Sequence, residues 1–147
     1  MNQKEIAVSR FAEGFNCAQS VFSALAPQLG LPEETALKVA AAFGGGMGRT
    51  GEVCGVVSGA LMAIGLKYGA TVGPDEATKA KTYALAREFM DRFRARHGNV
   101  RCSDLLGCDA GTHEGRQWAK EKGLFETLCP GLVGDAVEIA SDILERA

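Results

Sequence analysis

Cysteine is the residue type in this sequence with the most distinctive chemistry. The chain has five cysteines, which are Cys17, Cys54, Cys102, Cys108 and Cys129. The polar start Met1–Glu5 does not resemble the apolar stretch of an export signal. Without such a signal we expect a cytoplasmic protein, and cysteines there more often serve redox chemistry or metal binding than structural disulfides. The odd number of cysteines also fits a disulfide framework poorly.

Four of the five cysteines are expected at the starts of helices. Cys17 follows a capping asparagine, Cys54 lies in the first turn after a glycine-rich loop, Cys102 begins a short helical piece, and Cys129 precedes a proline. Unpaired N–H groups and partial positive charge at a helix N-terminus stabilise a thiolate over the thiol. Redox exchange and metal ligation both use the thiolate, so this pattern predicts either of the two.

Each cysteine taken alone also has a plain interpretation as a small buried hydrophobic residue. We assign that role to Cys108, which lies in the segment Leu105–Asp109 and is not expected at a helix start. The sequence contains no Cys-x-x-Cys, so it indicates neither a thioredoxin-type motif nor a zinc ribbon.

The hydrophobic pattern is helical, and β-branched residues never alternate with polar ones over a useful length. We expect helices over residues 4–13, 17–26, 32–43, 53–68, 74–97, 103–106, 114–122 and 130–144. The predicted fold class is all-α: one domain over residues 1–147, an antiparallel bundle of about six helices with a glycine-rich interhelical loop.

Two of the predicted helices carry informative faces. In helix 53–68, Gly55, Gly59 and Ala63 are spaced four apart, and such small residues let a neighbouring helix approach closely. In helix 74–97, the predicted apolar face consists of Ala80, Tyr83, Ala84, Ala86, Met90 and Phe93.

The glycine-rich loop over residues 44–51 is a candidate binding element. Its N–H groups could crowd around a sulfur atom or a small anion, and the candidate cofactor-binding residues are Gly45, Gly46, Gly48 and Gly55. The loop matches G-x-G-x-x-G, but a dinucleotide site needs a preceding strand, and here a helix precedes it. A tight connection between helices is the competing interpretation.

Charge and hydropathy exclude some classes of partner. The net charge is −2 and the pI is about 5.7, which argues against a general nucleic-acid binder. The longest apolar run, Val53–Leu66, is short and interrupted by glycines, so we expect no membrane insertion. The sequence is compatible with an unidentified redox partner protein and with a homodimer. We interpret His97 and His113 as surface histidines rather than as bases or ligands.

Three segments of the sequence resemble the C_GCAxxG_C_C family of redox-active proteins: Phe15–Ser20, Phe43–Gly48 and Gly51–Met62. The resemblance extends to Leu128–Pro130 and covers nearly the whole chain. It implies that Cys17, Cys54, Cys102 and Cys129 are the family's cysteines and that Gly55 and Gly59 are its glycines. Val56 departs from the alanine of the family's name, which is a modest change of volume.

Two functions follow as alternatives. In the first, which we favour by a small margin, a thiol-based oxidoreductase carries out thiol–disulfide exchange or electron transfer. Cys54 would be the attacking thiolate, and Cys17, Cys102 or Cys129 would resolve the mixed disulfide.

In the second alternative, all four thiolates hold an iron–sulfur cluster or another metal ion as cofactor. The family is similar to part of split-Soret cytochrome c, which keeps this alternative open. The absence of Cys-x-x-Cys-His gives no support for covalent haem attachment. A packing or interaction protein without thiol chemistry is a third interpretation.

Overall fold

The computed structural model describes residues 1–146, and their regular structure is helical, which confirms the all-α prediction. The helices are α1 (Gln3–Ala12), α2 (Cys17–Leu25), α3 (Glu33–Ala40), α4 (Gly55–Tyr68), α5 (Glu76–His97), α6 (Cys102–Leu106), α7 (His113–Glu121), α8 (Leu124–Thr127) and α9 (Cys129–Leu144), with 3-10 turns at Pro27–Leu29 and Ala41–Phe43. Most of these bounds lie close to the predicted ones, but the third predicted helix ends as a 3-10 turn and α8 was not predicted. No described helix has the length and apolar character needed to cross a bilayer.

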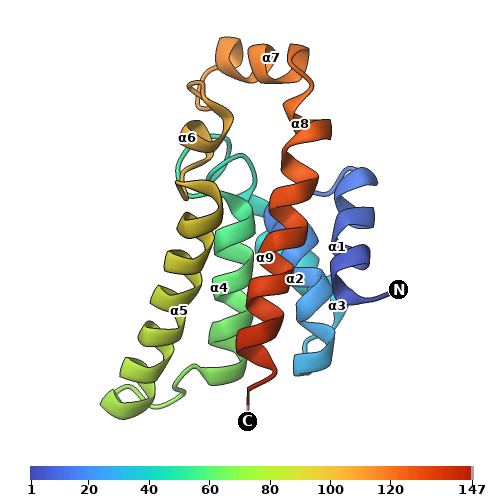
Figure 1. The fold of residues 1–147 in the computed structure, drawn as a ribbon. Coiled ribbons are helices and arrows are strands. Elements are labelled where there is room, and N and C mark those ends of the chain that lie inside the picture. The colour runs from blue at the N-terminus through green and yellow to red at the C-terminus, as the bar shows by residue number, and fades with distance from the viewer. Residues whose placement is uncertain (147) are drawn as a thin grey trace.

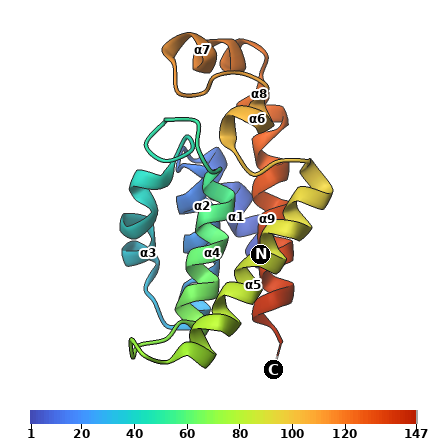
Figure 2. The ribbon, with the colours of Figure 1, turned by 90° about the vertical axis from the view of Figure 1, so that its left-hand side faces the viewer.

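The long helices alternate in direction along the chain, as expected for an antiparallel bundle (Figure 1). Because every second helix points the same way, α2, α4 and α9 all begin at one end of the bundle. The segment that contains α6, α7 and α8, residues 102–127, lies beyond this end in both views (Figures 1 and 2). We call it the distal segment.

Local signals in the sequence explain where the key helices begin. The Asn16 side chain accepts a hydrogen bond from the Gln19 N–H, and the Gln19 side chain accepts one from the Asn16 N–H. This reciprocal capping box fixes the start of α2 at Cys17. Pro130 occupies the first turn of α9, where its missing N–H costs nothing.

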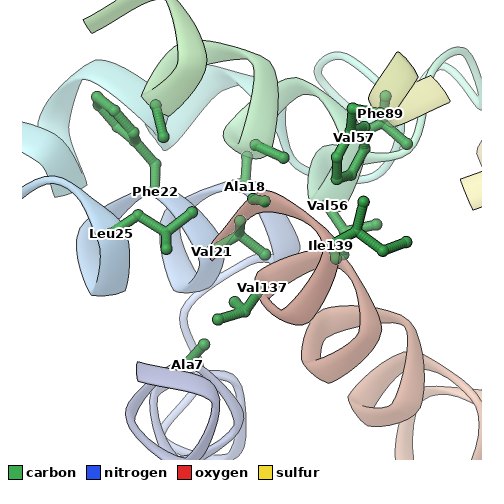
Figure 3. Packing of buried hydrophobic residues seen from close by; sticks show 14 of the residues in the cluster. Ala7, Ala18, Val21, Phe22, Leu25, Val56, Val57, Phe89, Val137 and Ile139 are labelled. Atoms are coloured by element: carbon green, nitrogen blue, oxygen red, sulfur yellow. The ribbon is translucent and has the colours of Figure 1, made fainter. Parts of the chain in front are cut away.

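The core is built around α2, α4 and α9, with α1 and α5 packed on its outside (Figure 3). Its closest contact joins α2 to α4. A β-carbon at Gly59 would lie 2.8 Å from the Ala18 carbonyl oxygen and 3.2 Å from Cβ of Val21. The predicted role of the small-residue row is therefore confirmed for Gly59, since no larger residue fits there without moving backbone.

The predicted apolar face of α5 is partly wrong. Phe89 and Phe93 are fully buried, whereas Tyr83 is 61% exposed and Ala80 and Ala84 are also exposed. The two phenylalanines, one turn apart, set the orientation of α5 against α4 and α9, because their rings remove far more apolar surface from water than alanine methyl groups do. The prediction gave alanines the same weight as large apolar residues, and it therefore placed the buried face of the helix on a side that does not include Phe89.

The contact at Gly59 yields a stability prediction with a matched control on the same helix. We expect Gly59→Ala to lower the free energy of unfolding by about 1–3 kcal/mol, because the new methyl group meets the backbone of α2. Gly65 also lies in α4, but a β-carbon there meets nothing within 4 Å. Gly65→Ala should therefore raise the free energy of unfolding by about 0.5–1 kcal/mol. Urea unfolding followed by circular dichroism measures both, and equal effects of the two substitutions would contradict the packing described.

Candidate functional site: a cysteine-lined pocket

A pocket of about 480 Å³ lies between the starts of the core helices and the distal segment. Four cysteines share its wall, and they are the four singled out from the sequence: Cys17, Cys54, Cys102 and Cys129. Cys108 does not line the pocket and packs at the edge of a small apolar cluster around Leu106 and Ala119. The part of the chain that the structure describes shows all five as free cysteines.

Each of the four pocket cysteines lies at the start of a helix. Cys17, Cys102 and Cys129 are the first residues of α2, α6 and α9, and Cys54 immediately precedes α4. The predicted placement at helix starts is thereby confirmed. The α2, α4 and α9 macrodipoles direct their positive ends to the same pocket, which favours negative charge there.

Gly55 brings Cys17 close to Cys54. A β-carbon at Gly55 would lie 2.7 Å from the Ala18 nitrogen and 3.1 Å from Cβ of Cys17. Since Gly55 follows Cys54 directly, the absence of its side chain lets the first turns of α2 and α4 meet. Two cysteines 37 positions apart in the sequence thus become neighbours.

A short backbone pairing brings Cys102 to the same wall. Val53 and Arg101 form an isolated antiparallel bridge. Around it, the Cys54 N–H donates to the Val100 carbonyl at 2.8 Å, and the Cys102 N–H donates to the Glu52 carbonyl at 2.7 Å. The bridge therefore fixes the start of α6 beside the start of α4.

The pKa values of the neighbouring Cys17 and Cys54 thiols are shifted in opposite directions. The pKa of Cys17 is raised well above its ordinary value, because its thiol donates to Cys129 and Cys54, is buried, and would feel any negative charge on these two sulfurs. The pKa of Cys54 is lowered, first by the hydrogen bond from Cys17 and then, against the effect of burial, by the N–H groups of Val56 and Val57. The hydrogen bond between them therefore favours the protonated form of Cys17 and the ionised form of Cys54.

Cys102 is the third thiol with a displaced proton affinity. Burial raises its pKa to about 12, and negative charge on Cys54, Cys129 and Cys108 adds to the effect. At neutral pH Cys102 is a protonated thiol.

The glycine-rich loop forms a left-handed turn against the pocket. Residues 45–49 all have φ between 62° and 73°, including the non-glycine residues Met47 and Arg49. Gly45 and Gly46 line the pocket together with Gly55, in line with their nomination from the sequence, although their role in binding a cofactor stays a prediction. A β-carbon at Gly46 would lie 2.8 Å from Cβ of Cys102.

The nomination of Gly48 needs correction. Gly48 does not line the pocket, and its N–H donates to the Ala42 carbonyl at 2.9 Å. The left-handed turn directs this N–H back to the preceding 3-10 turn, so it is not free to bind an anion. The loop joins α3 to α4 without any preceding strand in residues 1–146, which leaves no dinucleotide-binding unit among them.

One face of α7 supplies polar residues that sequence reasoning missed. The pocket-lining residues of this helix recur at helical spacing: His113, Arg116, Gln117 and Lys120. Trp118 does not line the pocket and is 42% exposed. The i, i+3, i+4, i+7 pattern was visible in the sequence, but a polar face is ordinarily assigned to solvent. His113 was interpreted as a surface histidine; it is exposed, yet it lines the pocket.

The residues of the pocket do not form a metal site as they are arranged. Within residues 1–146, no three side chains of the His, Cys, Asp or Glu type lie close enough together to hold one ion. The four cysteines share a pocket wall, but the described residues do not offer a ready-made set of metal ligands.

Comparison with known proteins gives one match. Residues 15–143 match the model of a family described as "Putative redox-active protein (C_GCAxxG_C_C)". No curated protein and no solved structure matches the chain. The family match spans all four pocket cysteines and both glycines that hold α2 against α4. The chain therefore belongs to the C_GCAxxG_C_C family, whose described character is redox activity.

Proposed function

We propose that this protein carries out thiol–disulfide exchange, with Cys54 as the attacking thiolate and Cys17 as the resolving thiol. The observation that carries the proposal is the placement of Cys17 and Cys54 side by side in one pocket, at the paired starts of α2 and α4, and the opposite directions of their pKa shifts agree with it. A dithiol that acts on disulfides needs one sulfur ionised for attack and a second held nearby as the proton-bearing partner.

Cys54 has the surroundings of a nucleophile. Its lowered pKa comes from Cys17, which donates a hydrogen bond to it, and from two N–H groups of the first turn of α4. Although Cys54 is only 4% exposed, it lines the pocket and is reached from there. The lowered pKa distinguishes Cys54 from a cysteine that only packs in the core, because burial in apolar surroundings raises the pKa of such a thiol.

The proposed reaction transfers two electrons. The Cys54 thiolate attacks one sulfur of a substrate disulfide, a bond forms between them, and the other sulfur leaves as a thiolate that takes a proton from water. Cys17 then releases its proton to water and attacks Sγ of Cys54, forming the Cys17–Cys54 disulfide and expelling the second thiolate. The cysteine pair is oxidised and the substrate disulfide is reduced.

Formation of the mixed disulfide itself helps Cys17 to ionise. The pKa of Cys17 is raised in part by donation to Cys54 and by the negative charge on Cys54. Both effects disappear once Cys54 is bonded to the substrate, because a disulfide sulfur is neutral. Formation of the mixed disulfide therefore removes part of what raises the pKa of Cys17, while the hydrogen bond to Cys129 and burial remain.

Cys102 and Cys129 have secondary roles in this scheme. The protonated state of Cys102 makes it a poor attacking group at neutral pH. Cys129 accepts from Cys17 and is therefore a second candidate to react with it. The alternative with four metal-bound thiolates has weaker support, since the pocket presents no three ligands in a metal-holding arrangement within residues 1–146.

Trapping the mixed disulfide tests the assignment of the two roles. We expect Cys17→Ser, treated with bis(2-hydroxyethyl) disulfide, to accumulate a stable adduct on Cys54, because the resolving sulfur is absent. Cys54→Ser should form no such adduct, and Cys102→Ser should behave like the unmodified protein and end with a Cys17–Cys54 disulfide. Peptide mass spectrometry locates the adducts. Adduct yields that are equally low in the unmodified protein and in Cys17→Ser would assign resolution to another thiol, and equally high yields would show that no thiol resolves the adduct.

The pH dependence of alkylation tests the hydrogen bond from Cys17 to Cys54. A donor to the thiolate favours the charged form, so we expect the iodoacetamide reaction of Cys54 to have a midpoint below the ordinary cysteine pKa. Cys17→Ala removes the donor and should move this midpoint to higher pH, slowing alkylation at neutral pH. Cys17→Ser retains a hydroxyl donor and should restore part of the shift. If the alanine variant kept the original midpoint, Cys17 would not be the activating group.

A further inference from the structure

The polar lining of the cysteine pocket is cationic. Arg49 from the glycine-rich loop and Arg116 and Lys120 from α7 line it, and no aspartate or glutamate does. This composition contrasts with the whole chain, which has a net charge of −2. The pocket therefore concentrates positive charge that the protein as a whole does not carry.

The three cations lack carboxylate partners, although most other arginines have them. Arg10 pairs with Glu33 at 3.0 Å, and Arg146 pairs with Glu88. Across residues 1–146, Arg49, Arg116 and Lys120 form no ion pair, and Arg116 donates only to the Ala110 carbonyl, at 3.4 Å. Their charges are available to a ligand.

We propose that the substrate of this pocket is a small disulfide that carries carboxylates. This inference rests on the thiol–disulfide exchange proposed above and specifies its substrate class. The carboxylates would lie against Arg49, Arg116 and Lys120, and the disulfide would lie over Cys54. The reaction is the two-electron exchange already written, with the acidic disulfide as the oxidant and two acidic thiols as products.

Size and access favour a small molecule over a folded protein. A pocket of about 480 Å³ falls within the range typical of small-molecule sites. Cys54 and Cys129 are 4% and 6% exposed, so a disulfide on the surface of a folded partner does not reach them without displacing the distal segment. Apolar side chains such as Phe11, Leu105 and Phe125 complete the lining and suit the methylene groups of such a substrate.

Three small disulfides of similar length test the charge preference directly. These are 3,3′-dithiodipropionate, which is a dianion, bis(2-hydroxyethyl) disulfide, which is neutral, and cystamine, which is a dication. The rate of oxidation of the reduced protein is measured with each disulfide. Each rate is then divided by the rate at which dithiothreitol reacts with the same disulfide, which corrects for the intrinsic reactivity of the three compounds. We expect the normalised rate to be about tenfold higher for the dianion than for the neutral compound at low salt, and lowest for the dication. The preference should shrink as salt is added.

Charge reversal assigns the preference to named residues. Lys120→Glu and Arg49→Glu should each reduce the dianion-to-neutral rate ratio by about tenfold at low salt, because an attractive charge becomes repulsive. Arg87→Glu is the matched control: this exposed arginine of α5 makes the same charge change, forms no ion pair within residues 1–146 and does not line the pocket. It should leave the ratio unchanged.

The outcomes separate this inference from the function on which it rests. If the protein reduces all three disulfides with equal normalised rates, or if Arg87→Glu changes the ratio as much as Lys120→Glu does, the acidic substrate is wrong and thiol–disulfide exchange stands. If the protein reduces none of them, including the neutral compound, the exchange function itself fails.

Discussion

The contact between α2 and α4 is the constraint on which the candidate site depends. Gly55 and Gly59 remove the side chains that would hold these helices apart, and Ala18 presents its backbone to both. Because the two helices run in the same direction, their close approach brings together their N-termini, where Cys17 and Cys54 lie. A larger residue at Gly55 would meet Cys17 itself, so helix packing and thiol pairing are set by the same few atoms.

Electrostatic coupling among the cysteines limits how many of them ionise. Aligned helix ends favour negative charge in the pocket, but several thiolates in one buried space repel one another. The thiol pKa values are accordingly shifted unevenly: that of Cys54 is lowered, whereas those of Cys17 and Cys102 are raised. Disulfide exchange needs one thiolate at a time, and the lowered pKa of Cys54 suits that role.

Much of the fold and part of the site could be predicted because the deciding signals are local. Capping by Asn16, the proline after Cys129 and the break over residues 44–51 place the helix starts without knowledge of the tertiary structure. The face of α5 and the polar face of α7 could not be assigned this way. Phe89 is buried because of what packs against α5, and Lys120 lines a pocket because the distal segment lies over the bundle end.

The glycine-rich loop over residues 44–51 has a strained backbone and contributes to the pocket wall. Met47 and Arg49 hold positive φ, a conformation that costs a side-chain-bearing residue about 1 kcal/mol or more. The turn is maintained by its glycines and by backbone hydrogen bonds, such as that from the Arg49 N–H to the Gly44 carbonyl at 2.9 Å. The same turn packs Gly46 against Cys102 and sets Arg49 in the pocket wall. The residues with positive φ thus lie where one loop both contacts a pocket cysteine and supplies a pocket cation, so the strained conformation coincides with the candidate site.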